Sequence, residues 1–363
     1  MNQKINLNIQ HALIELNAGK PLLIKESNGF SFLIASAENI TDQTIKDLKK
    51  HSGSDPSIII NKNRMNFLLK RPLNNDVFSL FPKDRLDADI CHKVSFANTV
   101  DSNLVSKFHF LNEKNNLVFA KLLELFKRCQ LIPAIVYCSI SRKILKSEVN
   151  DFGVYTLKCY NLDKYLKNRL GVNLVANASV PLSVCKESKI FGFKSEDGGK
   201  DHFAIVLKSA HEKKFPLVRI HSQCITGDLL GSLKCDCGSQ LTTSLDMLAK
   251  NGGILIYLNQ EGRDIGFLNK IHAYGIQNNG IDTFDANNAL GFDDDQRNYF
   301  VVVDILKTLG VTSIRLITNN PDKMRQLEKN GIKIHGCIPI KVDVGPEAKF
   351  YIETKKKKSG HKL

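Results

Sequence analysis

Residues 239–266 read SQLTTSLDMLAKNGGILIYLNQEGRDIG, and helix, strand and loop signals follow one another within this stretch. Residues 239–251 read as a helix that ends at a glycine pair, a typical C-cap. The run ILIYL at 254–258 is apolar throughout, as a buried strand would be, and it leads into the polar, glycine-containing loop NQEGRDIG. This order predicts a fold in which loops at strand ends carry the ligands.

The same alternation extends over the rest of the chain. Before residues 239–266 we expect strands at 20–26, 30–37, 133–140, 203–209 and 215–222, and helices at 41–51 and 118–130. After them we expect a helix, a loop, a helix and a strand at 267–280, 292–299, 301–310 and 313–318. Thr41 or Asp42 would cap the helix at 41–51.

Two domains are expected, because 363 residues can build two cores of ordinary size. A strand and a closing helix over residues 153–170 place the boundary near residue 170. We therefore predict an α/β (α+β) fold with domains at 1–168 and 172–363, each a mixed sheet with packed helices.

The composition is that of a globular protein, with 42% hydrophobic and 24% charged residues. It contains no apolar run of about 18 residues and no secretory signal, so we expect no membrane partner. Nine cysteines without such a signal indicate a reducing compartment, the cytoplasm. The net charge of +14 attracts phosphate-bearing partners, but no basic stripe with interleaved aromatic residues indicates nucleic-acid binding.

Three cysteines lie close together in HSQCITGDLLGSLKCDCGSQL, residues 221–241: Cys224, Cys235 and Cys237. Three ligands without an obvious fourth match an open, catalytic zinc site. Two alternatives stay open, a structural zinc site completed by His221 or His202 and a set of ordinary buried thiols. Nearby glycines, at positions 227 and 238, would allow tight ligation by sulfur.

Basic residues in loops at expected strand ends suggest a polyphosphate site, and no Walker A sequence is present. They are Arg219, Arg263, Arg297 and Lys323. Glu261 or Gln240 could read a purine, since an ionised Glu accepts hydrogen bonds from guanine donors. A surface Glu261 paired with Arg263 is the alternative. Spacing alone thus predicts a zinc hydrolase for a phosphorylated substrate.

Four segments together resemble GTP cyclohydrolase II, the first committed enzyme of riboflavin biosynthesis. They are RIHSQCITGDLLGSLKCDCGSQL, YLNQEGRDIGFLNKIHAYGIQNNGIDTFDANNALGF, DQRNY and LITNNPDK. The resemblance runs from about residue 172 to the C-terminus, and the final YIETKKKKSGHKL fits the family's ending.

The resemblance implies hydrolysis of GTP to 2,5-diamino-6-(5-phosphoribosylamino)pyrimidin-4(3H)-one, with release of formate and pyrophosphate. It implies one Zn²⁺ per chain on Cys224, Cys235 and Cys237, Mg²⁺ on the triphosphate, and a homodimer. Zinc-activated water would attack C8 of guanine, with Tyr274 orienting or deprotonating water. Arg297 would attack the α-phosphorus or stabilise the transition state, with Asp295 as general base.

The resemblance also implies a set of nucleotide-binding positions. They are Arg219, Ile220, His221, Ser222, Gln223, Gln240, Glu261, Gly262, Arg263, Thr283, Thr318 and Lys323. Three nearby positions depart from the family pattern, where Gln223 replaces Glu and both Asn259 and His272 replace Arg. These changes could weaken GTP affinity, but they leave the catalytic positions intact.

The first half is similar to 3,4-dihydroxy-2-butanone 4-phosphate synthase in ALIELNAGKPLLIKE and IASAENITDQTIKDLKKHSG. That family carries an acidic stretch where this chain has SNGFS, and a GHTE sequence that aligns with residues 117–120, LVFA. Enolisation without these groups is not credible. We expect the first half to have lost the synthase reaction, and deletion of residues 1–165 to spare GTP chemistry.

Two other classes of function remain as alternatives. One is a catalytically dead nucleotide-binding or scaffold protein of the riboflavin pathway. The other is a zinc-bearing nucleic-acid binder, which the net charge alone supports and for which salt dependence of binding would be steep.

Overall fold

The computed structural model describes residues 2–26, 29–99, 101, 103–112, 117–140, 153–342 and 345. Contacts divide the chain into a first unit, Met1–Asn168 with Leu268–Gln296, and a second unit, Arg169–Phe267 with Arg297–Leu363. The C-terminal YIETKKKKSGHKL and two residues of SNGFS lie outside the described part. No helix in the described ranges is long and apolar enough to cross a membrane.

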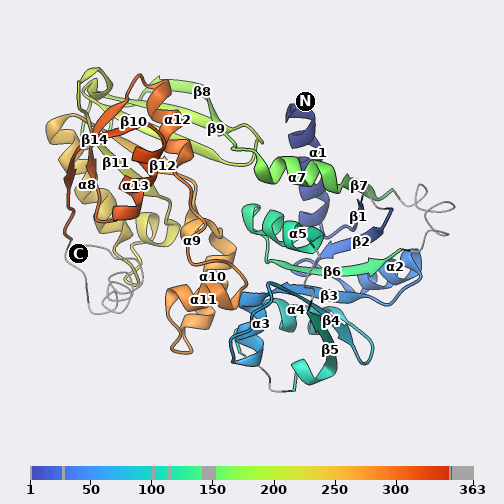
Figure 1. Ribbon diagram of the computed structural model, residues 1–363. Helices are drawn as coiled ribbons and strands as arrows, with labels where there is room; N and C mark the ends of the chain where they lie inside the picture. Colours follow the sequence, from blue (N-terminus) through green and yellow to red (C-terminus); the bar gives the residue numbers. More distant parts are fainter. Residues whose placement is uncertain are drawn as a thin grey trace. The chain divides into compact units, whose positions relative to one another are not determined.

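The described strands of the first unit form one sheet in the order β5-β4-β3-β6-β2-β1-β7 (Figure 1). Neighbours are antiparallel except for β1 and β7, which pair in parallel. The strands are β1 (Leu22–Lys25), β2 (Ser31–Ser36), β3 (Ser57–Asn61), β4 (Val77–Pro82), β5 (Phe108–Asn112), β6 (Ala134–Ser139) and β7 (Tyr155–Lys158). Every residue of β3 is buried, so this strand forms the centre of the core.

The helices of the first unit come from both parts of the chain that build it. They are α1 (Asn2–Asn17), α2 (Asp42–Ser52), α3 (Lys62–Leu69), α4 (Ala88–Phe96), η1 (Val105–Lys107), α5 (Leu117–Arg128), α7 (Cys159–Lys167), α10 (Phe267–Gln277) and α11 (Thr283–Ala289). Thr41 caps α2, where its side chain accepts a hydrogen bond from the Thr44 N–H at 3.1 Å. The N-cap of this helix is therefore Thr41 and not Asp42.

The second unit also has one sheet among its described strands, in the order β14-β13-β11-β12-β10-β9-β8 (Figure 1). Strands β14, β13, β11 and β12 run parallel, whereas β12, β10, β9 and β8 pair antiparallel. The strands are β8 (Val172–Ser179), β9 (Ser188–Ser195), β10 (Asp201–Leu207), β11 (Leu217–Ser222), β12 (Gly253–Leu258), β13 (Ser313–Ile317) and β14 (Lys333–Ile338). The expected α/β fold with two mixed sheets is confirmed.

The parallel strands decide where the functional loops of the second unit lie. Strands β13, β11 and β12 are neighbours, so their carboxyl ends meet at one edge of the sheet. Thr318, Gln223 and Asn259 are the first residues after these ends. The helices are η2 (Ala210–Glu212), η3 (Ile225–Leu229), α8 (Cys237–Asn251), α9 (Glu261–Asp264), α12 (Phe300–Thr308) and α13 (Pro321–Lys329). The expected loop at 259–266 therefore contains the short helix α9.

Candidate active site

The three cysteines singled out in the sequence form one cluster in the second unit. The Sγ atoms of Cys224, Cys235 and Cys237 lie within 4.8 Å of one another, and those of Cys224 and Cys235 are 3.7 Å apart. Tetrahedral zinc with Zn–S bonds of about 2.3 Å would place its sulfurs about 3.8 Å apart. The cluster therefore has the dimensions of a zinc site.

The cluster needs a cation before all three thiols can ionise together. The pKa of Cys235 is raised, first by its hydrogen bond with Cys224 and also by burial. A divalent cation stabilises thiolates that otherwise repel one another. The donor set thus fits zinc, the ion that three thiolates with an open position favour.

Two glycines make the sulfur cluster sterically possible. A Cβ atom on Gly227 would lie 2.9 Å from the Cys235 Sγ and 3.1 Å from the Cys224 Sγ. A Cβ on Gly238 would collide with the carbonyl oxygen of Gly227. The contacts with the Cys235 Sγ and with the Gly227 carbonyl oxygen are shorter than real Cβ contacts, and the contact with the Cys224 Sγ is tighter than most. Glycine is therefore favoured at both positions by lack of space and not by backbone conformation.

A buried carboxylate, Asp228, organises the loop that carries Cys224. Its side chain accepts hydrogen bonds from the Cys224 N–H at 3.0 Å, from His221 Nε2 at 3.0 Å and from the Tyr257 hydroxyl at 2.7 Å. Burial and this hydrogen bond raise the pKa of Tyr257, and burial lowers the pKa of His221. His221 is therefore neutral and donates to Asp228. Sequence reasoning missed Asp228, although a carboxylate between ligand cysteines was a usable signal.

Neither histidine completes the metal cluster in the described residues. Among the described residues, the one group of His, Cys, Asp or Glu side chains that could hold a metal ion contains the three cysteines and no histidine. His221 Nε2 is committed to Asp228, and His202 Nδ1 accepts the Asn259 N–H at 3.0 Å. Each ring keeps a second nitrogen, so what favours the open, three-ligand site over a closed structural one is the absence of any histidine nitrogen from the cluster.

Buried Arg219 and half-buried Gln240 form a chain of hydrogen bonds that ends at the Cys-x-Cys segment. Arg219 donates to Gln240 Oε1 at 2.7 Å, and Gln240 Nε2 donates to Asp236 at 2.6 Å. Asp236, which lies between Cys235 and Cys237, is 2% exposed. Burial lowers the pKa of Arg219 to about 10, against the opposing effect of nearby Cys237 and Asp236, so the guanidinium stays protonated at neutral pH. The pair thus places a fixed positive charge beside the cluster.

Glu261 lies next to the cluster as well. Its carboxylate accepts the N–H of Ile225, the residue after Cys224, at 2.6 Å, and only 3% of Glu261 is exposed. The two residues that follow, Gly262 and Arg263, both have left-handed backbones, with φ of 63° and 62°. A left-handed arginine is uncommon and typical of functional turns. The buried position of Glu261 disfavours the surface-pair alternative.

The loop after β13 brings a lysine to the same edge. Asn320 caps α13 by accepting the Asp322 N–H at 2.9 Å, and its own N–H donates to the Thr318 hydroxyl at 3.0 Å. Lys323, in the first turn of α13, is 7% exposed and donates to the Ile220 carbonyl at 3.1 Å. Thr318 and Lys323 are thus fixed by backbone contacts near the end of β11.

The remaining predicted residues divide between the units. Ile220, His221 and Ser222 end β11, and the Gln223 N–H donates to the Leu258 carbonyl at 2.8 Å. Arg297 also belongs to the second unit. Those in the first unit are Tyr274 on α10, Thr283 at the start of α11 and Asp295 after it.

Two of the departures from the family pattern have structural partners. The Asn259 N–H holds His202, as described above. The His272 ring lies 5.1 Å from the Phe96 ring, and both belong to the first unit. His272 therefore packs against a residue from the first half of the chain.

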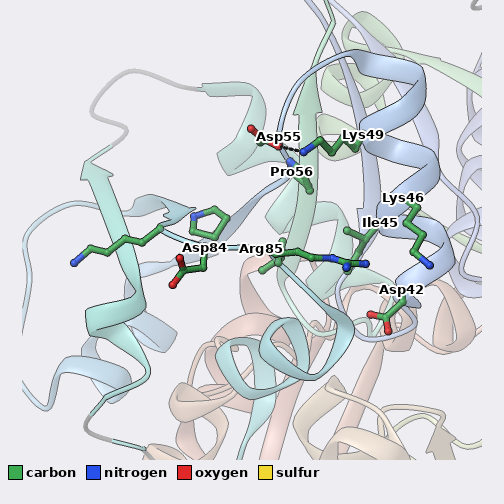
Figure 2. Close-up of a pocket in the computed structure, with 11 residues that line it drawn as sticks. Asp42, Ile45, Lys46, Lys49, Asp55, Pro56, Asp84 and Arg85 are labelled. Atoms are coloured by element: carbon green, nitrogen blue, oxygen red, sulfur yellow. Dashed lines mark ion pairs between the residues drawn. The ribbon is translucent and has the colours of Figure 1, made fainter.

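A cavity of about 560 Å³ in the first unit contains none of these residues (Figure 2). Figure 2 shows Lys49 reaching Asp55, with which it forms an ion pair of 2.5 Å. Asp42, at another wall, accepts the Ala88 N–H at 2.8 Å. The cavity is lined by both basic and acidic side chains, so it favours neither anionic nor cationic ligands.

Comparisons with known proteins agree with the site. A family model described as GTP cyclohydrolase II matches residues 173–339. A GTP cyclohydrolase-2 of Azospirillum brasilense is 30% identical over 97% of this chain and 93% of its own length. A GTP cyclohydrolase-2 of Histophilus somni is 47% identical over 52% of this chain and 88% of its own. The riboflavin biosynthesis protein RibBA of Thermotoga maritima is 45% identical over 55% of this chain and 51% of its own length.

Proposed function

The chain belongs to the GTP cyclohydrolase II family, and on that premise we propose that it hydrolyses GTP in riboflavin biosynthesis. The product would be 2,5-diamino-6-(5-phosphoribosylamino)pyrimidin-4(3H)-one, with formate and pyrophosphate released. The observation that carries the proposal is the three-thiol cluster at the edge where three parallel strands end.

Zinc on Cys224, Cys235 and Cys237 is part of the proposal. When bound, zinc supplies Lewis acidity and activates water for attack on a carbon centre. The sulfur spacing, the glycines beside the sulfurs and the exclusion of histidine from the cluster support one ion with an open position. Mg²⁺ on the triphosphate is proposed from the resemblance alone.

The other residues would bind and orient GTP. Glu261, fixed by Ile225, is suited to accept hydrogen bonds from the guanine edge. Arg219 and Lys323 would supply positive charge whose geometry is set before binding. We assign water orientation to Tyr274, and pyrophosphate release to Arg297 with Asp295. The left-handed Gly262 and Arg263 would bring backbone close to the ligand.

We also propose that the first half has lost synthase activity. Phe119, in the segment that aligns with the family's catalytic GHTE, is 2% exposed. Its ring packs against those of Phe32 and Tyr137 at 5.3 and 4.9 Å. An aromatic cluster has replaced the polar groups that enolisation requires.

One assay tests both statements. Purified protein with its zinc quantified is supplied with GTP and ribulose 5-phosphate in separate reactions. We expect formate and pyrophosphate from GTP and no product from ribulose 5-phosphate. No turnover of GTP by protein with one zinc per chain would instead support the scaffold alternative. Turnover of ribulose 5-phosphate would contradict the loss of synthase activity.

Substitution of a cysteine tests the metal site. Cys235→Ser should lose zinc and lower GTP turnover at least about 100-fold, because it removes one of three ligands. Cys159→Ser, in the first unit, is the control and should keep both. Formate release near the wild-type rate from a zinc-free Cys235→Ser protein would refute the site.

Two further proposals concern the state of the protein. A homodimer is implied by the resemblance, and sedimentation at several concentrations would test it.

A reducing compartment such as the cytoplasm is supported by the nine cysteines, all described, of which no two form a disulfide.

A further inference from the structure

Residues from the first half of the chain hold the segments that carry Tyr274, Thr283 and Asp295. All of them lie within the first unit, where Leu268–Gln296 packs with Met1–Asn168. The contacts reach both helices of this stretch, α10 and α11, and the loop that follows α11.

The central contact is made by Arg64 of α3, which is 1% exposed. Burial lowers the pKa of Arg64 to about 9, but this value is still above neutral pH, so the guanidinium stays protonated. Its guanidinium donates to backbone carbonyls at the ends of two helices, one from each half of the chain. The acceptors are Lys93, Val94, Ala97 and, at 2.6 Å, Ala289.

Three further side chains hold the loop after α11. Asn61 donates to the Gly291 carbonyl. Asn63 donates to the Phe292 carbonyl at 2.9 Å, and Lys127 pairs with Asp293 at 2.9 Å. From the last turn of α11, Asn288 donates to Asp294 at 2.9 Å. The loop is therefore held at the backbone of Gly291 and Phe292 and by the side chains of Asp293 and Asp294, the residues just before Asp295.

The helix that carries Tyr274 is held by the same half of the chain. Asn269 donates to the Gln130 carbonyl at 2.7 Å. Gly275 of the same helix faces Asn98, since a Cβ at position 275 would lie 2.5 Å from the end of the Asn98 side chain. His272, where the family has Arg, packs on Phe96.

We propose that the first half of this chain is a positioning module for GTP hydrolysis, in which Asn63, Arg64 and Lys127 hold the loop that carries Asp295. This inference rests on the proposed function, because Asp295 and its neighbour Arg297 are assigned to the GTP reaction there.

The test uses the full-length, zinc-loaded enzyme and avoids the buried Arg64. Asn63→Ala with Lys127→Met removes contacts to the loop only. The matched control, Asn66→Ala with Lys121→Met, changes the same two helices. Asn66 accepts the Leu73 N–H at 2.9 Å and Lys121 pairs with Asp163 at 2.5 Å, so neither touches the loop.

We expect kcat for pyrophosphate and formate release to fall about ten-fold in the loop variant, since small displacements of reacting groups are costly. Zinc content, KM for GTP and the thermal midpoint should stay close to those of the control, because part-exposed ion pairs contribute little stability. Amide hydrogen exchange over 288–296 should quicken only in the loop variant.

Three outcomes separate the explanations. A lower kcat with faster exchange over 288–296 supports the inference. A kcat equal to that of the control, or unchanged exchange, overturns it. A wild-type protein without any activity on GTP contradicts the proposed function instead, and exchange then still decides whether the first half holds the loop.

Discussion

Gly227 lies where a single added methyl group would meet two sulfur atoms of the cysteine cluster. We expect Gly227→Ala to lower zinc content and GTP turnover at least about ten-fold, because the ligand sulfurs must move apart and zinc tolerates little error in bond length. Zinc analysis by mass spectrometry and a formate assay would measure both.

The control for that prediction is Gly336→Ala. Gly336 lies in β14 and a Cβ there would meet nothing within 4 Å. This variant should keep its zinc and its turnover. Equal zinc content in the two variants would show that the sulfur cluster relaxes easily, and the steric argument would then be wrong.

His202 gives the second unit a stability that depends on pH. Burial lowers its pKa from 6.5 to about 4. Between these values the unfolded chain binds the proton and the folded chain does not. Stability therefore falls as the pH drops from 6.5 to 4, by on the order of 3 kcal/mol at most. Urea unfolding at several pH values would measure this loss.

His202→Asn should flatten that part of the pH profile, because an amide oxygen can accept the Asn259 N–H without titrating. His109→Asn serves as the control, since His109 is exposed and should leave the slope unchanged. A slope retained in His202→Asn would show that other groups cause the acid sensitivity.

At the residue scale, the sequence predicts the cysteine cluster better than the residues that support it. The spacing of the three cysteines and the nearby Gly227 and Gly238 were visible along the chain, and the structure brings them together. Asp228 and Tyr257 were not predicted as partners. Their hydrogen bond joins residues on different elements, and local spacing carries no record of such a contact.

At the element scale, the cap of α13 links helix stability to the position of Lys323. Asn320→Ala should cost about 1 kcal/mol of unfolding free energy. The first turn should also loosen, so that KM for GTP rises about five-fold, equivalent to about 1 kcal/mol of binding. Thermal unfolding and steady-state kinetics would measure the two effects.

Thr41→Ala provides the comparison, because it removes an equivalent cap from α2 in the first unit. Its unfolding cost should be similar, with KM unchanged. If both variants raise KM alike, the effect comes from general destabilisation and not from Lys323.

Elements were predictable where periodicity was strong. The strands at β1, β2, β6, β11, β12 and β13 and the helices α2, α5, α8, α10 and α12 lie where the sequence predicts them. Helix α1 was overlooked although it buries Ile5, Ile9, Ala12 and Leu16, a helical spacing, because polar residues obscure the pattern. Strand pairing was beyond reach, since it depends on contacts between distant segments.

At the scale of the whole molecule, the two units do not follow the order of the chain. Leu268–Gln296 lies inside the segment that resembles GTP cyclohydrolase II, yet it packs with Met1–Asn168. Sequence patterns cannot reveal this packing, because nothing local marks Ala289 as an acceptor for Arg64. The domain limits 1–168 and 172–363 remain a prediction.

This packing changes what we expect from truncation. The sequence suggests that the chain without residues 1–165 keeps GTP chemistry. The structure leads to the opposite expectation, because Leu290 and Phe292, at most 1% exposed, would lose the unit in which they are buried. A chain that starts at Arg169 should be insoluble or at least about ten-fold less active.

Solubility and turnover of that truncate, assayed beside the full chain at equal zinc content, would measure the change. Added first-half protein, residues 1–168, offers a control, because reassociation should recover part of the activity. A soluble truncate with wild-type kcat would refute the dependence.

The split composition of the first unit also imposes an order on biosynthesis. Arg64 is translated early, but its acceptor Ala289 follows only after most of the second unit has been made. At 5–20 residues per second, the ribosome needs roughly 5–25 s to extend the chain from Asn168 to Gln296. During that interval the guanidinium of Arg64 in the nascent first unit lacks the Ala289 carbonyl as an acceptor. Chaperones therefore have a defined period in which to act.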